Sequence, residues 1–195
     1  MDLSGLALDV PEGYRWVYPR APVAIQIGST PGWGWYAVDP RRAPFASEAE
    51  TAAHVAESRR EVGDFVTQLL TRLEVPRKRT LLMGFSQGAA VALHVGLASP
   101  ESFAGIVFMS GYFPVPETLT GASGLAPGPI LPQPILIVHG ILDQVLPISL
   151  AREAKAWLVA EGLDPRYQEF PMDHQITPKS FGAVRDFMSE VLPLG

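Results

Sequence analysis

The sequence lacks cysteine altogether in its 195 residues, which excludes disulfide bridges, thiolate metal sites and a cysteine nucleophile. It also lacks a basic excess, because 15 Lys and Arg stand against 20 Asp and Glu, for a net charge of −5. Without a basic run or stripe, we expect no nucleic-acid partner. No apolar run approaches the roughly 20 residues of a membrane span. The start, Met1–Gly5, shows no basic segment followed by an apolar one, so we expect no signal peptide.

These absences are compatible with a cytoplasmic protein, although a secreted protein without disulfides would look the same. No grouping of His, Asp and Glu has metal-ligand spacing, and no glycine-rich phosphate loop is present, so we expect no metal and no cofactor. A chain of this length with 47% apolar residues can bury one core and is short for two. With no internal repeat and no linker, we predict a single α/β domain over residues 1–195.

The most informative stretch is a serine between two glycines. An apolar run over residues 80–83 stops at Gly84, Ser86 follows, and a small-residue, helix-like segment begins after Gly88. This is Gly-x-Ser-x-Gly between a strand and a helix, the turn that lifts a serine hydroxyl clear of a sheet edge in a strained backbone position. Both glycines are expected where larger side chains would clash between strand and helix.

The remaining elements alternate between strands and helices. Apolar strands without alternation, separated by amphipathic helices, predict a parallel sheet covered on both faces. Two Pro/Gly-rich stretches, residues 20–44 and 114–134, are predicted to be long connections. We expect strands near 14–18, 80–84, 103–109, 135–138 and 167–170, and helices near 3–10, from Ser47 to 73, from the serine turn to 99, 149–161 and 177–191.

Three residues follow three different strands in the order Ser86, Asp143, His174. Loops after parallel strands gather at one edge of the sheet, so these side chains can converge. His174 would take the proton from Ser86 as the hydroxyl attacks a carbonyl, and Asp143 would orient the imidazole and stabilise its charged form. The backbone N–H of Gln87, at the helix start, would donate to the developing oxyanion.

Each of these residues also has a plainer interpretation. Ser86 can be a small residue in a strand–helix turn, Asp143 a turn or capping residue, and His174 an ordinary loop histidine. Asp173 is the rival acid, but it is adjacent to His174 and cannot easily reach around to the ring. For the histidines outside this constellation, packing or a loop hydrogen bond is the favoured role: His54, His94 and His139.

Aromatic residues within the first long connection are candidates for a substrate pocket, because long ordered loops in compact domains tend to be functional. The same side chains can equally cover the edge of the core. The three residues concerned are Trp33, Trp35 and Tyr36.

Three motifs together resemble the phospholipase/carboxylesterase family of α/β-hydrolases, which includes the acyl-protein thioesterases. They are Gly84-Phe85-Ser86-Gln87-Gly88, His139-Gly140-Ile141-Leu142-Asp143 and Phe170-Pro171-Met172-Asp173-His174. Further landmarks are Tyr18–Pro22, Trp35-Tyr36 and Ser110–Pro114. The resemblance covers nearly the whole chain. It implies an α/β-hydrolase fold that cleaves esters or thioesters, with Ser86, Asp143 and His174 as triad and Gln87 as oxyanion donor.

Two features depart from that family. Asp173 stands where most members have glycine. No His-Gly-x-Gly motif, which ends a central strand and supplies a second oxyanion N–H in the family, precedes Tyr14. Losing one such donor costs about 10²–10³ in rate, and a missing central strand leaves backbone groups unpaired. We therefore predict either a homodimer through an exposed sheet edge or low activity.

The leading hypothesis is a serine esterase for short to medium acyl esters, with lysophospholipids and acyl thioesters as further candidate substrates. The alternative from a different class is a low-activity or non-catalytic relic that binds acyl ligands without turnover. A peptidase or a dienelactone-type hydrolase is a third reading, but dienelactone hydrolases use a cysteine nucleophile, and this chain has none.

Overall fold

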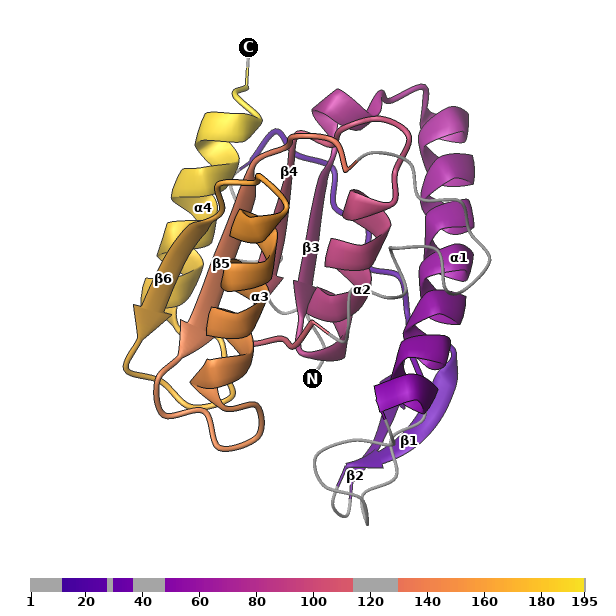
Figure 1. Cartoon of the computed structure of the whole chain (residues 1–195). Coiled ribbons are helices and arrows are strands. Elements are labelled where there is room, and N and C mark those ends of the chain that lie inside the picture. The colour runs from indigo at the N-terminus through magenta and orange to yellow at the C-terminus, as the bar shows by residue number, and fades with distance from the viewer. Residues whose placement is uncertain (1–11, 28–29, 37–47, 114–129, 195) are drawn as a thin grey trace.

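The computed structural model describes residues 12–27, 30–36, 48–113 and 130–194. Its centre is a four-stranded sheet in the order β3 (Leu81–Phe85), β4 (Gly105–Met109), β5 (Ile135–Gly140) and β6 (Arg166–Phe170). All three neighbouring pairs are parallel. The helices are α1 (Glu48–Leu73), α2 (Gln87–Leu97), α3 (Ile148–Ala160) and α4 (Pro178–Val191), with a short 3₁₀ helix at Arg77–Arg79 (Figure 1).

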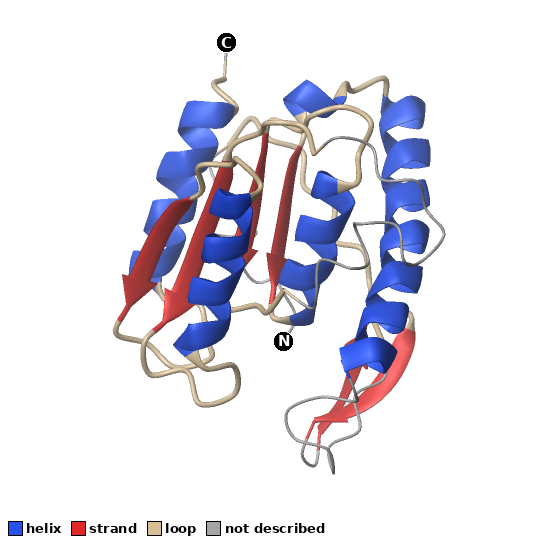
Figure 2. Cartoon of the chain, viewed as in Figure 1, coloured by secondary structure: helices blue, strands red, loops and turns tan. Residues whose placement is uncertain are grey.

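Helices cover both faces of the sheet, as the sequence predicts (Figure 2). Side chains of β4 alternate between the two faces, with Ile106 and Phe108 in one apolar cluster and Val107 and Met109 in the other. The first cluster contains residues of α2 and α3, and the second contains Phe181 and other residues of α4. α1 packs outside α2. Burial on both faces explains why β4 and β5 are continuous apolar runs.

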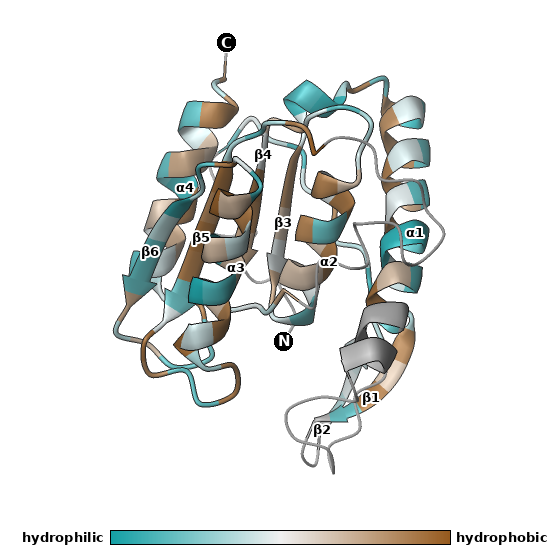
Figure 3. Cartoon of the chain, viewed as in Figure 1, coloured by the Kyte–Doolittle hydropathy of each residue, from teal (hydrophilic) through white to brown (hydrophobic). Residues whose placement is uncertain are grey.

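The two edges of the sheet differ in character. β6 is hydrophilic and β5 beside it hydrophobic (Figure 3), and the β6 residues Arg166 and Glu169 form ion pairs with Glu190 and Arg152. Charged side chains of this kind discourage further strand pairing. At the other edge, β3 pairs with β4 on one side and with no other described strand.

The prediction of a strand over residues 14–18 is wrong. These residues form no ladder, because no described strand lies in register beside them to exchange hydrogen bonds. The segment is instead tied to the C-terminus, since Tyr14 donates its hydroxyl to the Leu192 carbonyl at 2.6 Å. Tyr14 and Trp16 pack on the apolar cluster beneath α4. These two aromatic side chains therefore cover one side of the apolar core.

The prediction of a connection without strands over residues 20–44 is also wrong in part, because two strands lie within it. β1 (Val23–Ile27) and β2 (Thr30–Gly34) form an antiparallel hairpin with Ile27 opposite Thr30. The sequence signal was the Gly28-Ser29 pair between two extended runs, a hairpin dipeptide. The hairpin is a separate two-stranded sheet.

The predicted helices agree with the structure to within a few residues. α1 begins at Glu48 as expected, and α4 is capped by Thr177, whose hydroxyl accepts from the Ser180 N–H at 3.2 Å. α3 ends before Gly162, which adopts a positive φ of 81°. The predicted helix at 3–10, the Ser47 cap and residues 114–129 lie outside the described residues.

Candidate active site

Ser86 stands at the junction of β3 and α2 in a backbone conformation that non-glycine residues rarely adopt, with φ 57° and ψ −123°. The turn is anchored at Ser86 itself, whose N–H donates to the Met109 carbonyl of β4 at 3.0 Å. A Cβ on Gly84 would lie 2.0 Å from the Gly88 carbonyl oxygen, so only glycine allows the strand and helix to approach this closely. The strained serine turn predicted from the motif is therefore present.

Gly88 has a different role from the one predicted. A Cβ built there would meet no strand atom within 4 Å, and its nearest contact would be the Trp35 indole nitrogen at 3.4 Å. The tight strand–helix approach depends on Gly84, whereas the space at Gly88 admits the Trp35 side chain.

His174, in the loop between β6 and α4, points both its ring nitrogens at predicted partners. Its Nε2 lies 3.1 Å from the Ser86 Oγ, and its Nδ1 lies 2.8 Å from the Asp143 Oδ2. The ring packs against Phe85, with centroids 4.8 Å apart. The structure thus brings the three residues together in a hydrogen-bonded chain.

Asp143 is buried, and each of its carboxylate oxygens has partners. Oδ1 accepts from the N–H groups of Val145 at 3.0 Å and Leu146 at 2.8 Å, while Oδ2 faces the His174 ring. Both interpretations of Asp143 therefore hold: Oδ1 caps the turn, and Oδ2 faces His174 as the orienting acid would. These donors satisfy the hydrogen-bonding capacity of a carboxylate that is shielded from water.

Asp173, the rival acid, is exposed and does not serve the ring. Its Oδ1 accepts the N–H groups of Gln144 at 3.1 Å and His174 at 2.8 Å. These two bonds, the Gln144 bond first, lower the pKa of the Asp173 carboxyl. Asp173 thus links the His174 loop to the Asp143 loop.

His139 lies behind the acid, fully buried at the end of β5. Its Nε2 is 2.8 Å from the Leu146 carbonyl and 3.5 Å from the Asp143 Oδ2. Because a carbonyl can only accept, this nitrogen carries the proton. Burial lowers the pKa of His139, so the neutral ring is favoured. The sequence favoured packing or a loop hydrogen bond for His139, but it did not indicate that the loop is the one that holds Asp143.

The three aromatic pocket candidates occupy different environments. Trp33 is 52% exposed, with the Arg20 guanidinium 4.7 Å from its ring centroid. Trp35 is half-buried with its indole nitrogen over Gly88. Tyr36 is buried among the side chains of α1 and α2 and belongs to the core. The Trp35 indole therefore lies against the first turn of α2, two residues after Ser86.

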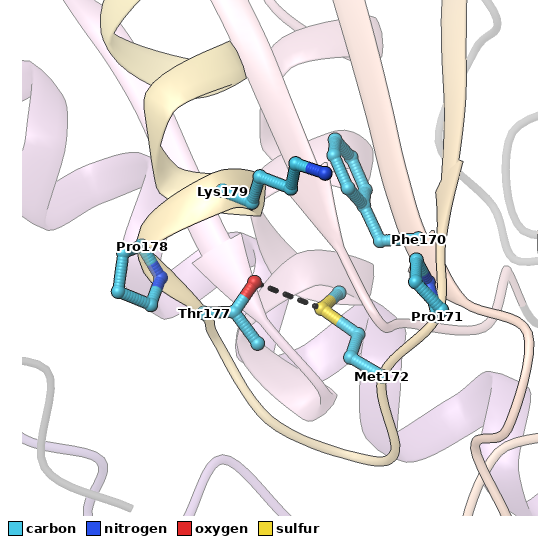
Figure 4. Close-up of a pocket in the computed structure, with 6 residues that line it drawn as sticks. All are labelled: Phe170, Pro171, Met172, Thr177, Pro178 and Lys179. Carbon is cyan, nitrogen blue, oxygen red and sulfur yellow. Dashed lines mark hydrogen bonds between the residues drawn. The ribbon is translucent and has the colours of Figure 1, made fainter.

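A surface hollow lies on the α4 side of the His174 loop (Figure 4). It contains none of Ser86, Asp143 and His174, and a 3.7 Å contact from the Thr177 hydroxyl to the Met172 sulfur crosses it. This hollow is therefore separate from the triad. Its lining residues are Phe170, Pro171, Met172, Thr177, Pro178 and Lys179.

The described residues contain neither a metal-ligand cluster nor a membrane-spanning helix. No cluster there has three His, Cys, Asp or Glu side chains placed to hold a metal ion. None of the described helices combines the length and the apolar character that crossing a membrane requires.

Comparison with known proteins identifies relatives along almost the whole chain. Acyl-protein thioesterase 1 homolog 1 of Dictyostelium discoideum is 26% identical over 92% of this chain and 77% of its own length. Acyl-protein thioesterase 1 of Neurospora crassa is 29% identical over 92% of this chain and 74% of its own. The crystal structure of esterase PE8 superimposes with a TM-score of 0.75 at 28% identity, covering 89% of this chain and 77% of that one.

The match to the Phospholipase/Carboxylesterase family spans residues 9–192. Together with the esterase structure, it confirms the predicted α/β-hydrolase fold. The family and the relatives are hydrolases of esters and thioesters, which supports the predicted class of reaction. The chain belongs to the phospholipase/carboxylesterase family of α/β-hydrolases.

Proposed function

We propose that this protein is a serine hydrolase that cleaves carboxylic esters or thioesters through an acyl-enzyme on Ser86. The observation that carries the proposal is the position of His174, 3.1 Å from the Ser86 hydroxyl and 2.8 Å from the Asp143 carboxylate. A base within hydrogen-bond reach of a nucleophile, itself oriented by a third group, is the geometry of nucleophilic catalysis.

In the first half-reaction the Ser86 Oγ attacks the substrate carbonyl carbon, and His174 Nε2 accepts the hydroxyl proton. The tetrahedral intermediate collapses as the bond to the alcohol or thiol breaks, and His174 returns that proton to the leaving group. In the second half-reaction His174 takes a proton from water, whose oxygen attacks the acyl carbon. The bond from this carbon to the Ser86 Oγ then breaks, His174 returns the proton to Ser86, and the carboxylic acid is released. Asp143 stabilises the imidazolium in both halves.

The developing oxyanion is proposed to accept from the Gln87 N–H. α2 begins at Gln87, so this donor belongs to the first turn, where N–H groups have no intrahelical partner. The positive end of the helix dipole adds to the stabilisation of negative charge at this point.

The proposed substrates have an apolar acyl part: short to medium acyl esters, with lysophospholipids and acyl thioesters as candidates. The loop that carries Asp143 supports this, because Ile141, Leu142 and Val145 are all exposed there, Val145 by 59%. Exposed apolar side chains grouped beside a reactive centre suit an apolar ligand.

Hydrolysis of p-nitrophenyl acetate and butyrate by the purified protein and by Ser86→Ala tests the proposal. We expect turnover that the substitution abolishes, and equal turnover in the variant would disprove it. Labelling with a fluorophosphonate distinguishes the alternative of a low-activity or non-catalytic acyl-ligand-binding relic, because only an activated serine reacts.

A second proposal concerns association. The open side of β3, which pairs only with β4 among the described strands, supports a homodimer through this sheet edge. Native mass spectrometry tests this, and a monomer with full esterase turnover would contradict it. A single domain and a cytoplasmic location stay predictions, to be tested by limited proteolysis and cell fractionation.

A further inference from the structure

The segment that follows β2 is fastened to the helices by side chains. The Gln87 side chain accepts the Trp35 N–H at 3.0 Å and donates to the Tyr36 carbonyl at 3.2 Å. From α1, the buried Ser58 hydroxyl donates to the Trp35 carbonyl at 2.9 Å. Three hydrogen bonds from two helices therefore hold the backbone of two consecutive residues, Trp35 and Tyr36.

The surroundings of this clamp are tight. A Cβ on Gly34 would lie 2.9 Å from the Gln87 Oε1, so a side chain at this position would crowd the Gln87 amide. The Trp35 indole nitrogen stands 3.4 Å from the position of a Cβ built on Gly88. The clamp thus fixes the indole against the helix turn that starts at the nucleophile.

No backbone ladder could replace these bonds. β1 and β2 pair only with each other and form no ladder with β3–β6, and the hairpin lies apart from the four-stranded sheet (Figure 1). Apolar packing of Tyr36 also holds the segment, but packing is non-directional. The hydrogen bonds to the N–H and to the carbonyl of Trp35 are directional and set the position and rotation of this residue.

We propose that Gln87 and Ser58 are positioning residues that hold Trp35 as a fixed apolar wall for the acyl chain of the substrate. The inference rests on the proposed function of Ser86. It gives Gln87 two separate tasks: its backbone N–H faces the oxyanion, and its side-chain amide places the wall.

The test uses p-nitrophenyl esters of two, four and eight carbons, which share one leaving group and differ in acyl length. Gln87→Glu keeps the acceptor for the Trp35 N–H and the backbone N–H but sets a carboxylate against the Tyr36 carbonyl. Ser58→Ala removes the third bond at a site away from the nucleophile. Ser189→Ala is the matched control, because the Ser189 hydroxyl bonds only the Arg185 carbonyl of its own helix at 2.9 Å.

We expect both variants to lower kcat/KM for the eight-carbon ester about fivefold, mainly through KM, with a smaller loss for the acetate. Fluorophosphonate labelling of Ser86 should persist, and Ser189→Ala should match the wild type. A loss of equal size for all three esters, or a lower thermal midpoint with unchanged acyl-length dependence, would overturn the proposal. Absence of both labelling and turnover in the wild type would instead overturn the proposed function.

Discussion

The two sides of Ser86 are built by different means. On one side, His174 and Asp143 stand on loops after the neighbouring strands β6 and β5. Main-chain bonds join these loops, from the Ile141 N–H to the Phe170 carbonyl at 2.8 Å and from the Leu142 N–H to the Met172 carbonyl at 3.1 Å. On the other side, Trp35 is held by the side chains of Gln87 and Ser58.

This difference has consequences for substitution. A side built from backbone bonds tolerates most side-chain changes, except at the reacting groups and at glycines where two chains cross. A side held by side chains can shift with a single substitution and leave the chemistry in place. The acid–base side should therefore be rigid and the Trp35 side adjustable.

The largest effect is expected from Asp143→Asn. The amide keeps an acceptor for Val145 and Leu146 but cannot hold the His174 tautomer or stabilise its charge. We expect kcat for p-nitrophenyl butyrate to fall about 10⁴-fold, with the thermal midpoint little changed. Retention of more than a tenth of the activity would mean that another group orients His174.

Gly140→Ala tests the crossing of the two loops. The new Cβ would lie 2.2 Å from the Met172 carbonyl oxygen, so both loops must separate. We expect a loss of about 2–4 kcal/mol in the free energy of unfolding, measured in urea, with a lower kcat. Gly182→Ala in α4, where a Cβ meets nothing within 4 Å, is the control and should be stabilising. Equal stability of the two variants would refute a close crossing.

Trp35→Ala tests the adjustable side directly. Loss of the indole should raise KM for an eight-carbon p-nitrophenyl ester about tenfold, because its apolar contact with the chain is lost. The effect on the acetate should be smaller. A uniform fall in kcat would show that Trp35 supports the nucleophile turn rather than the acyl chain.

His139→Gln should change the pH dependence of stability. Burial lowers the pKa of the folded His139, so below the ordinary value of about 6.5 the unfolded chain binds more protons. The wild type should therefore lose stability as pH falls from 7 to 5, and the variant should lose less. Thermal midpoints at these two pH values check this, and identical slopes would show that the buried ring does not contribute.

Much of the rigid side was predictable because its signals are local. The glycines around Ser86, the apolar runs of β4 and β5, and the polar residues at strand ends are each visible within a few positions. A parallel sheet then places strand ends at one edge without further information. The prediction of a strand at residues 14–18 failed because a strand also needs a neighbouring strand to pair with, and a local sequence pattern does not indicate whether one is present.

From the sequence alone we predicted the family, the α/β layers and the three residues that the structure joins in one hydrogen-bonded chain, Ser86, His174 and Asp143. Three contacts became visible only in the tertiary structure. They are the bond of His174 to one particular oxygen of Asp143, the bond of His139 to the Leu146 carbonyl in the Asp143 loop, and the bond of the Gln87 side chain to Trp35. The last pair is 52 residues apart in sequence. Such contacts depend on how separately folded elements pack, and short-range periodicity and turn chemistry hold no record of that packing.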